Sequence, residues 1–539
     1  MLSYQDAYRA LSVPKLARDV LSGSLDEGTN AAIECCDRWA DDGRVAINWI
    51  GRNFAKEEIT FTELRDRSSR FANLLRARGI GQGDVVGGLL PRIPDFFVAA
   101  LGAWRIGAIY QPLFTAFGPA AIESRVTATG GSQAKLIVTD EINLPKLKEV
   151  RNCPPVLVVD HGRTDVGGFA AELESHPDYC PPVLLRGSDP FVILFTSGTT
   201  GHPKGVRWPL NLLLTTAVYM RDAIDLQPDD NYWNVADPGW AYGMIYAVVG
   251  PLLLGHATTF YEGGFTIDGA MRIMAEQRVT NLAAAPTVYR LMMAAGDAAM
   301  APLVGQLRVA SSAGEPLNPE VVRWAERVLH VPLKDHYGQT ETLMIVANHH
   351  ALHHDVKPGS AGLPMLGFSL AILDDELQPV PPNSPGILAV HRANSPLFFF
   401  DGYWNASTPS FRGEWYLTGD TMQQDTDGYF YFLGRSDDII TSAGYRIGPF
   451  DVESVIIEHP SVAEVAVIGI PDPERTEIVK AFIVLRAGAA GSDTLKAELQ
   501  QHVRTRLSLH AYPREVEFVN ELPKTPSGKV QRYLLRQQH

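Results

Sequence analysis

Short apolar runs alternate with amphipathic stretches along most of the chain. Residues 59–84, ITFTELRDRSSRFANLLRARGIGQGD, predict a short strand, a helix capped by a threonine, and a glycine turn. Residues 85–113 repeat the theme with an apolar strand, a helix and a second apolar strand. The runs AKLIVTD, PPVLVVD and FVILFTS are further short strands that end in polar residues. Apolar strands that alternate with helices indicate an α/β protein whose sheets are covered on both faces.

The pattern changes near residue 435. Residues 429–454 place Gly, Ser and Asp between two apolar stretches, as a hinge does. Beyond them, two strand patterns, a helix pattern and a third strand pattern predict a compact α+β domain of about 100 residues. We therefore expect a large N-terminal domain of α/β subdomains, residues 1–435, and a smaller mobile C-terminal domain, residues 436–539. The final stretch PKTPSGKVQRYLLRQQH is broken by Pro and Gly, which puts Lys529 on a loop.

Composition narrows the function classes. The chain has 539 residues and a net charge of −14, and no stripe dense in Lys and Arg stands out. Nucleic acid and anionic membranes are therefore poor partners, and an anionic substrate must be bound by a local site. The four cysteines show no metal-ligand spacing, and Cys35 and Cys36 are adjacent, so a disulfide between them would be strained. No apolar run has the length of a membrane span, and we expect a reduced, cytoplasmic environment.

The loop TSGTTGHPKG, residues 196–205, follows the apolar run FVILF. Successive backbone amides in such a loop can form an anion-binding nest, and Lys204 adds a cation suited to phosphate. Taken alone, the loop fits a solvated turn equally well.

Two further motifs end in carboxylates. YGQTE at 337–341 ends in Glu341, which could hold Mg²⁺ or cap a helix. YLTGD ends in Asp420, which could accept two ribose hydroxyls or form a turn.

Together these pieces identify a family. The chain resembles, over essentially its full length, the adenylate-forming superfamily of acyl-CoA synthetases, adenylation domains and luciferases. The matching motifs occur in the family's order: TSGTTGHPKG, SSAGEPLNPE, DHYGQTET, YLTGD, GRSDDIITSAGYRIGPFDVES and PKTPSGK. Within the superfamily, the segments ADPGWAYGMIYAVVGPLLLGHATTFYEG and AAAPTVYRLM are similar to the branch of acetyl- and medium-chain acyl-CoA synthetases.

The resemblance implies a reaction in two steps. A carboxylate attacks the α-phosphorus of Mg-ATP to give an acyl-adenylate and pyrophosphate, and the thiol of coenzyme A then displaces AMP. The resemblance also implies which residues bind the nucleotide. The β- and γ-phosphates are expected to contact Thr196, Ser197, Gly198, Thr199, Thr200 and Lys204, and adenine is expected to contact Gly314, Glu315, Pro316, Asp335, His336 and Tyr337. Thr340 is expected to contact the α-phosphate, Asp420 the ribose, and Arg435 the ribose or a phosphate. Glu341 is expected to hold Mg²⁺.

Catalysis by such a site needs positioning and charge neutralisation rather than a protein nucleophile, because carboxylate and triphosphate repel each other. Lys529 is expected to bring a cation to the region where charge develops. In the family the C-terminal domain then rotates about the hinge, here Asp437. This rotation would bring Gly444 to the pantetheine tunnel and Arg446 near coenzyme A or phosphate, while Lys529 leaves.

The resemblance also bears on the acid. Acetyl-specific enzymes carry a bulky Trp where Gly338 stands, so we expect a pocket that admits acids larger than acetate, either short- or medium-chain, branched or aryl. Four residues are expected to shape the rest of the acyl pocket, namely Trp240, Ala241, Tyr242 and Gly243.

Several alternatives stay open at this stage. An adenylating enzyme could load a separate carrier protein instead of coenzyme A, and a non-catalytic binding protein could keep the fold. In related synthetases the segment around Lys529 is a target of reversible lysine acylation, so an acyltransferase or deacylase is a possible partner. The oligomeric state and the acid itself are not fixed by the sequence. HHALHHD, residues 349–355, has His pairs at i,i+4 spacing that could chelate Zn²⁺ on a helix, but we expect a solvated loop.

Overall fold

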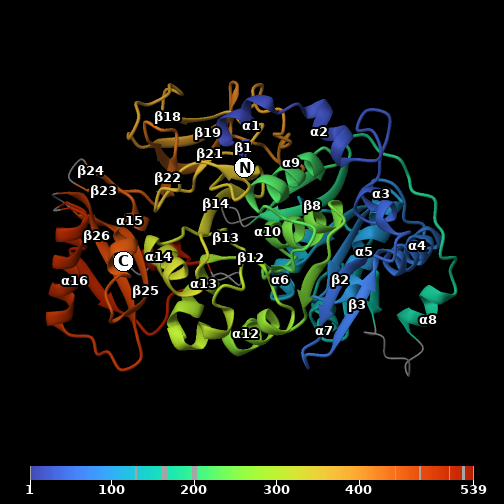
Figure 1. The fold of residues 1–539 in the computed structure, drawn as a ribbon, viewed down its shortest axis with the longest axis horizontal. Helices are drawn as coiled ribbons and strands as arrows, with labels where there is room; N and C mark the ends of the chain where they lie inside the picture. Colours follow the sequence, from blue (N-terminus) through green and yellow to red (C-terminus); the bar gives the residue numbers. More distant parts are fainter. Residues whose placement is uncertain are drawn as a thin grey trace.

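A computed structural model describes residues 2–127, 130–159, 168–196, 203–442, 445–472, 475–508, 510–524 and 529–537, without the side chain of Arg446. Figure 1 shows a large α/β assembly and, at its left, a smaller unit formed by the last hundred or so residues. The mixed α/β class and the division into a large and a small part agree with the sequence patterns.

The larger of two α/β sheets has nine strands within the described residues, in the order β17-β15-β14-β13-β12-β10-β11-β2-β3. The strands from β14 to β2 run parallel, and β3, β15 and β17 pair antiparallel at the edges. Their bounds are β2 (Val45–Ile50), β3 (Lys56–Thr60), β10 (Tyr232–Asn234), β11 (Thr258–Tyr261), β12 (Asn281–Ala284), β13 (Val309–Ala313), β14 (Leu333–Gln339), β15 (Leu343–Ala347) and β17 (Leu363–Pro364).

The second α/β sheet has six strands in the described part of the chain, in the order β7-β6-β4-β5-β8-β9, with β9 antiparallel at one edge. Their bounds are β4 (Val85–Leu89), β5 (Ile109–Pro112), β6 (Leu136–Asp140), β7 (Val156–Val159), β8 (Pro190–Thr196) and β9 (Lys204–Pro209). Every residue of β4, β5 and β6 is buried. The expected sheet with both faces covered is therefore confirmed for these strands.

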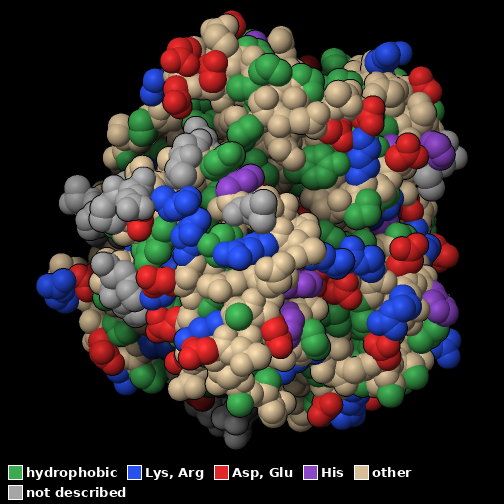
Figure 2. Space-filling view, turned by 90° about the vertical axis from the view of Figure 1, so that its left-hand side faces the viewer, with side chains coloured by type: hydrophobic (Ala, Val, Ile, Leu, Met, Phe, Trp, Pro, Cys, Tyr) green, Lys and Arg blue, Asp and Glu red, His purple; other side chains and the backbone are tan. Residues whose placement is uncertain are grey.

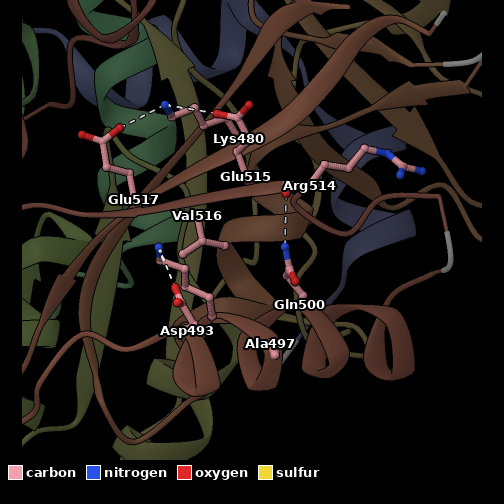
Figure 3. Close-up of a pocket in the computed structure, with 9 residues that line it drawn as sticks. Lys480, Asp493, Ala497, Gln500, Arg514, Glu515, Val516 and Glu517 are labelled. Atoms are coloured by element: carbon pink, nitrogen blue, oxygen red, sulfur yellow. Dashed lines mark hydrogen bonds and ion pairs between the residues drawn. The ribbon is translucent and has the colours of Figure 1, made fainter.

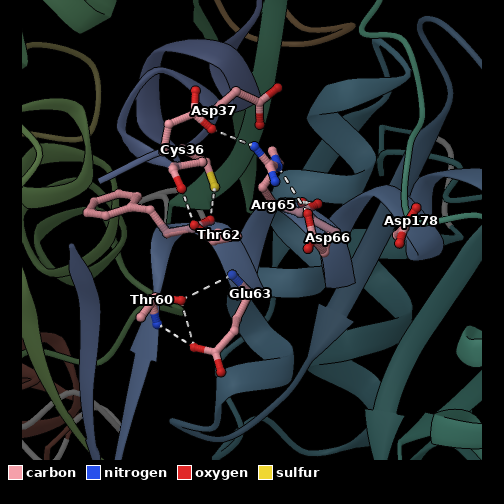
Figure 4. A network of polar contacts seen from close by, with 12 residues as sticks. Cys36, Asp37, Thr60, Thr62, Glu63, Arg65, Asp66 and Asp178 are labelled. Atoms are coloured by element: carbon pink, nitrogen blue, oxygen red, sulfur yellow. Dashed lines mark hydrogen bonds and ion pairs between the residues drawn. The ribbon is translucent and has the colours of Figure 1, made fainter. Parts of the chain in front are cut away.

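Helix α4 (Phe61–Ala77) shows how the sequence sets local structure. The Thr60 hydroxyl accepts a hydrogen bond from the Glu63 amide at 3.2 Å, and the Glu63 carboxylate accepts one from the Thr60 amide at 2.8 Å (Figure 4). This reciprocal capping satisfies two of the amides that a helix start leaves unpaired. Gly79, with φ of 77°, follows the helix in the left-handed conformation that favours glycine. The predicted threonine cap and glycine turn are confirmed.

The remaining helices of the large part connect or cover these sheets. Their bounds are α1 (Tyr4–Ala10), α2 (Val13–Val20), α3 (Ala31–Cys35), η1 (Asp37–Trp39), α5 (Pro94–Arg105), α6 (Pro119–Val126), α7 (Leu144–Lys148), α8 (Phe169–Glu174), α9 (Leu212–Val218), η2 (Tyr219–Ala223), α10 (Ala241–Gly243), η3 (Met244–Val249), α11 (Gly250–Leu253), α12 (Ile267–Glu276), α13 (Pro286–Ala294), η4 (Asp297–Leu303), α14 (Pro319–Trp324) and η5 (Ala325–Leu329). No helix in the described ranges is long and apolar enough to cross a membrane.

A third, five-stranded sheet follows in the chain and lies above the C-terminal unit in Figure 1. Its antiparallel strands are β18 (Leu370–Leu373), β19 (Gly386–His391), β20 (Phe411–Arg412), β21 (Trp415–Gln424) and β22 (Phe430–Arg435). In the β21–β22 pair, Asp420 lies opposite Arg435, where β22 ends and the chain enters the C-terminal unit.

The C-terminal unit has its own sheet, in the order β24-β23-β26-β25, with β27 beside β26. Its elements are β23 (Ile440–Ser442), β24 (Tyr445–Ile447), α15 (Pro449–Ile456), β25 (Val462–Asp472), β26 (Thr476–Leu485), α16 (Asp493–Arg506), β27 (Glu515–Phe518) and α17 (Arg532–Arg536). The order of β25, β26, α16 and β27 confirms the predicted strand, strand, helix and strand.

The start of the chain is joined to a segment far along it. Strand β1 (Leu2–Ser3) pairs in parallel with β16 (Leu352–His353). The hydroxyl of Tyr4 donates to the carbonyl oxygen of Pro364 at 2.9 Å, and that of Tyr8 donates to Phe368 at 2.7 Å. Helix α1 is therefore held by residues some 360 positions away.

The segment HHALHHD departs from the sequence expectation. His349 is 0 % exposed and His350 is 7 % exposed, so the predicted solvated loop is wrong for both. His350 Nε2 donates to the carbonyl of Ala310 at 3.1 Å, and Leu352–His353 forms β16 instead of a helix. In the described residues no group of three or more His, Cys, Asp or Glu is arranged to hold a metal ion.

Buried neutral histidines predict a pH dependence of stability. Burial holds the pKa of His350 well below its ordinary value of 6.5. Below that value the unfolded chain binds a proton that the folded chain refuses, so the contribution of His350 to stability is present above pH 6.5 and is lost as the pH falls. We expect His350→Gln to reduce the fall in melting temperature between about pH 7.5 and about pH 5.5.

The matched control is His353→Gln, because His353 lies on β16 three residues away and its side chain is exposed. Thermal unfolding followed by circular dichroism at each pH measures the effect. An identical pH profile in the wild type and His350→Gln would contradict the prediction.

Candidate functional site

Lys204 and Glu341 meet at one tyrosine, Tyr403. Lys204 begins β9, and its Nζ lies 4.9 Å from the centre of the Tyr403 ring. The Tyr403 hydroxyl donates to Glu341 Oε1 at 2.7 Å. The buried indole of Trp208 on β9 donates to the Thr340 carbonyl at 3.0 Å, which ties β9 to the same turn. Residues from 204, 340–341 and 403 thus form one face of the site.

Asp420 forms the centre of the opposite face. Its carboxylate is 4 % exposed and accepts hydrogen bonds from the Tyr337 hydroxyl and, at 2.7 Å, from Gln339 Nε2. Arg435 Nη1 lies 3.5 Å from Asp420 Oδ1, and Arg435 Nε lies 3.3 Å from Asp437 Oδ1. The structure therefore joins DHYGQTET, YLTGD and the hinge motif in a single polar cluster.

The two carboxylates of this site, Glu341 and Asp420, lie in surroundings that disfavour their ionised forms. Burial raises the pKa of Glu341 above its ordinary value, and the nearby Asp420 acts in the same direction. Burial likewise raises the pKa of Asp420, while the cations of Arg435 and Lys529 act to lower it. Lys529 is exposed, yet its charge reaches Asp420 from the C-terminal unit. The site thus gathers two buried acids that a further cation would stabilise in their ionised forms.

The residues expected around adenine line the ends of β13 and β14. Gly314 follows β13 with φ of 92°, and the Glu315 carboxylate is held by Thr287 Oγ1 and Arg290 Nη2, each at 2.8 Å. Pro316 follows and is half-buried. Asp335, opposite Ser312 in the sheet, has a buried Oδ1 with no hydrogen-bond partner in the described part of the chain. Buried polar atoms of this kind are usually satisfied by a partner, so Asp335, the third residue of β14, leaves a polar atom for a ligand to pair with.

His336 takes a different position from Asp335 and Tyr337. Its Nε2 donates to the Asn348 carbonyl at 3.4 Å, so its Nδ1 accepts the 2.7 Å hydrogen bond of the Tyr219 hydroxyl. Burial lowers the pKa of His336 to about 3, which keeps the ring neutral. Side chains alternate along a strand, and His336 faces the packing against η2 while Tyr337 faces Asp420.

The segment expected to shape the acyl pocket packs against aromatic residues near α6. The Trp240 ring lies 5.5 Å from that of Phe114 and 5.6 Å from that of Phe117. Ala241 and Tyr242 follow in the short helix α10, and the Tyr242 ring lies 5.5 Å from that of Tyr246. At Gly243 a Cβ atom would stand 2.1 Å from the Asp237 carbonyl oxygen, so this position tolerates only glycine without backbone movement.

Gly338 lies at a bulge between β14 and β15. The pairing register shifts between Tyr337 and Gly338. A Cβ atom at Gly338 would stand 2.0 Å from the carbonyl oxygen of Leu343 and 2.7 Å from Met344 Cα. Glycine is therefore required here by the close approach of the β15 backbone, in addition to any effect on the acyl pocket.

Some expected site residues lie outside the described residues. These are Ser197, Gly198, Thr199, Thr200 and Gly444. Arg446 is described only as part of β24. Thr196 ends β8, where it pairs with Lys204 of β9.

Sequence reasoning missed three polar residues of the cluster. Gln339 stands inside the quoted motif and bonds Asp420, and Tyr416 donates to Gln339 Oε1 at 3.2 Å. Tyr403 bridges Lys204 and Glu341 but lies in FFFDGYWN, a run that looks like ordinary core. A phenol that bridges a distant cation and carboxylate leaves no local pattern.

A pocket of about 390 Å³ within the C-terminal unit lies apart from this cluster (Figure 3). Its Lys480 is paired with Glu515 at 3.4 Å and with Glu517 at 3.0 Å. None of the residues expected from the motifs lines it. On the face of the molecule seen in Figure 2, Lys and Arg side chains are interspersed with Asp and Glu.

The C-terminal unit touches the large part beside the site. Asn318 Nδ2 donates to Ser454 Oγ at 3.1 Å, and Arg323 Nη2 lies 3.4 Å from Glu458 Oε1. A cavity of about 470 Å³ lies at this boundary and is lined by residues of both parts, among them Tyr431 and Phe450. Contacts of this kind resemble a transient interface more than a packed core.

Comparison with known proteins adds the family context. Residues 36–404 match the family model of AMP-binding enzymes, and residues 451–529 match that of the AMP-binding enzyme C-terminal domain. An acetyl-coenzyme A synthetase of Bacillus subtilis is 37 % identical over 526 residues, covering 94 % of this chain and 90 % of the relative. The crystal structure of a Brucella canis acyl-CoA synthetase is 52 % identical, covers 100 % of this chain and 99 % of its own, and superposes with a TM-score of 0.81. A benzoate CoA ligase from Burkholderia xenovorans LB400 is 26 % identical with a TM-score of 0.83, covering 94 % of this chain and 100 % of its own.

The close approach at Gly338 predicts a stability effect. Gly338→Ala places a methyl group against the β15 backbone, and overpacking of this kind lowers the free energy of unfolding by about 1–3 kcal/mol. Urea denaturation measures the change. Gly264→Ala is the control, because no atom lies within 4 Å of a Cβ there. Equal stability of the two variants would show that β15 yields without cost.

Proposed function

Because the chain belongs to the AMP-binding enzymes and is an AMP-forming acid–thiol ligase of the acyl-CoA synthetase type, we propose that it activates a carboxylic acid larger than acetate with ATP and transfers the acyl group to coenzyme A. The observation that carries the proposal is the meeting of Lys204, Glu341, Asp420 and Arg435 in one cluster that the charge of Lys529 reaches. These residues come from four separate motifs, and a polyphosphate ester with a cation fits their combined charges.

In the proposed first step, the acid's carboxylate attacks the α-phosphorus of ATP, the bond to the β-phosphate breaks, and pyrophosphate leaves. Lys204 and the loop that includes Thr196, Ser197, Gly198, Thr199 and Thr200 hold the leaving group. Lys529 offsets the negative charge of the two reactants, and Thr340 contacts the α-phosphate. Asp420 accepts the ribose hydroxyls, with Arg435 beside it. Adenine lies against Gly314, Glu315, Pro316 and Tyr337, where the unpartnered Asp335 Oδ1 supplies an acceptor.

Glu341 is the residue that would hold Mg²⁺ in this proposal. Oxygen ligands suit this ion, which proteins usually bind through one or two carboxylates together with substrate phosphates. Glu341 fits, because its carboxylate is buried and an adjacent cation would counter the effect of burial on its pKa. Mg²⁺ bound there would neutralise phosphate charge.

In the second step the thiol of coenzyme A displaces AMP. We assign residues 436–539 as the mobile unit, with Asp437 at the hinge and Gly444 and Arg446 facing coenzyme A after rotation. The polar contacts and the cavity at the boundary support such movement, because a tightly packed apolar interface would resist it.

The acid is the least determined part of the proposal. Trp240 with Phe114 and Phe117 gives the neighbourhood an aromatic character, whereas the place of a side chain at position 338 is taken by the backbone of β15. The similar proteins include both an acetyl-coenzyme A synthetase and a benzoate CoA ligase. We favour short- or medium-chain, branched or aryl acids.

Loading of a separate carrier protein is the less favoured alternative, because the similar proteins are named as synthetases or ligases of coenzyme A. Thioester formation with free coenzyme A distinguishes the two. Acylation of Lys529 by a partner enzyme would remove the cation that acts on Asp420 and would silence the first step.

The first testable consequence concerns Lys529. We expect Lys529→Ala to slow acid-dependent exchange of pyrophosphate into ATP by about 100-fold or more, because a cation at the developing charge is removed. Conversion of supplied acyl-adenylate and coenzyme A to thioester should persist. Lys524→Ala is the control, since Lys524 lies in the same tail but pairs with Glu464 at 2.5 Å. Equal loss of both half-reactions in Lys529→Ala would refute the assignment.

The second consequence concerns the acid. Each buried methylene contributes about 0.8 kcal/mol, or roughly fourfold in kcat/KM, until the pocket is filled. We expect acids of about four to eight carbons, or an aryl acid of similar size, to exceed acetate in a panel of pyrophosphate-release assays. A clear preference for acetate would exclude the larger pocket.

A further inference from the structure

Two arginines of the C-terminal helix bind acids on the hinge side of their own unit. Arg532 Nη2 lies 2.7 Å and 2.8 Å from the two carboxylate oxygens of Glu453, and its Nη1 lies 3.7 Å from Asp438 Oδ2. Arg536 is hydrogen-bonded to the same Asp438. Glu453, on α15, is 8 % exposed and also accepts the amide of Val467 at 2.8 Å. Two cations and two anions thus form one network, in which Glu453 is buried and the other three residues are partly buried.

The network continues into the hinge through the backbone. The amides of Asp438 and Ile439 donate to the carbonyl of Arg435 at 2.9 Å and 3.1 Å. The side chain of Arg435 reaches back to Asp420 and Asp437. Asp438 therefore joins the acidic cluster of the nucleotide site, through the backbone of Arg435, to the arginines of α17.

Lys529 stands next to this network along the chain. Two residues separate it from Arg532. Val530, the residue after Lys529, forms a bridge with Lys524, and the Gln531 amide donates to the Pro523 carbonyl at 2.8 Å. The orientation of α17 thus limits where the Lys529 ammonium can reach.

Anchoring of α17 by itself does not require the ion pairs. Leu535 is 3 % exposed and packs into an apolar cluster with Ile468, Phe482 and Leu522. Replacing a buried ion pair by apolar groups is often neutral for stability. Since Leu535 already anchors α17, the ion pairs of Arg532 are better explained as fixing the orientation of this helix. Through Asp438 and the backbone of Arg435, the network connects to the hinge and to Asp420.

We propose that Arg532 is a positioning residue for the first half-reaction, holding the Lys529 segment at the hinge through Glu453 and Asp438. The assignment rests on the proposed role of Lys529. When the unit rotates for the second half-reaction, Lys529 is no longer used, so the network matters to one step and not to the other.

The test compares both half-reactions in Arg532→Met, which keeps an unbranched apolar stem and removes the charge and the donors of the guanidinium. We expect acid-dependent pyrophosphate exchange to fall by about 100-fold, the loss that a displacement of about 1 Å can produce. Thioester formation from supplied acyl-adenylate should stay within about twofold of wild type, and Arg532→Lys should restore part of the exchange.

Glu453→Gln and the double variant complete the design. If the two residues act as one unit, the double variant loses no more exchange activity than the more impaired single variant. The control is Arg504→Met, whose guanidinium lies over the Tyr512 ring, 3.8 Å from its centre and outside the network. Its half-reactions should match wild type.

Loss of both half-reactions in equal measure in Arg532→Met, or loss of neither, would overturn the positioning role while leaving the proposed function intact. Absence of pyrophosphate exchange in the wild type with every acid of the panel would overturn the proposed function and this role with it.

Discussion

Two buried carboxylates that repel each other organise this protein. Glu341 lies in the turn between β14 and β15, Asp420 lies on β21 of the third sheet, and both are buried; the charge of Asp420 adds to the effect of burial in raising the pKa of Glu341. Arg435 on β22 and Lys529 in the tail supply the opposing charge, and Tyr337, Gln339 and Tyr403 supply the hydrogen bonds. Burial and mutual repulsion of carboxylates are unfavourable, so such a cluster persists only where the surrounding structure holds its side chains in place. Arrangements of this kind are usual at sites that bind ionic ligands.

Much of the fold could be read from the sequence because its determinants are local. Thr60 with Glu63 marks the start of α4, and continuous apolar runs mark β4 and β6. The motif residues Lys204, Glu341, Asp420 and Arg435 could be predicted as a site because the resemblance to a family fixed their order. Their mutual contacts could not, since Tyr403 makes its two bonds to residues 62 and about 200 positions away.

The segment 349–355 shows the limit of composition. A run with four histidines reads as polar, yet the structure buries His349 beside Tyr4 of the first helix and His350 against the Ala310 carbonyl. Burial of a neutral imidazole requires a donor or acceptor that comes from elsewhere, here the Ala310 carbonyl for His350. Gly338 is a second instance: the sequence indicates an absent side chain, whereas the structure shows that the neighbouring strand occupies its place. Single substitutions there cannot simply exchange one acyl preference for another.

The pairing of β1 with β16 has a consequence for synthesis of the chain. Leu2 finds its partner, Leu352, only after about two thirds of the polypeptide has been made. At about 5–20 residues per second, helix α1 waits for roughly 20–70 s on the ribosome without its native contacts. Throughout that interval the site on which Tyr4 and Tyr8 pack does not exist. Residues 2–10 thus complete their native contacts only after residues 352–368 have been made, long after their own synthesis.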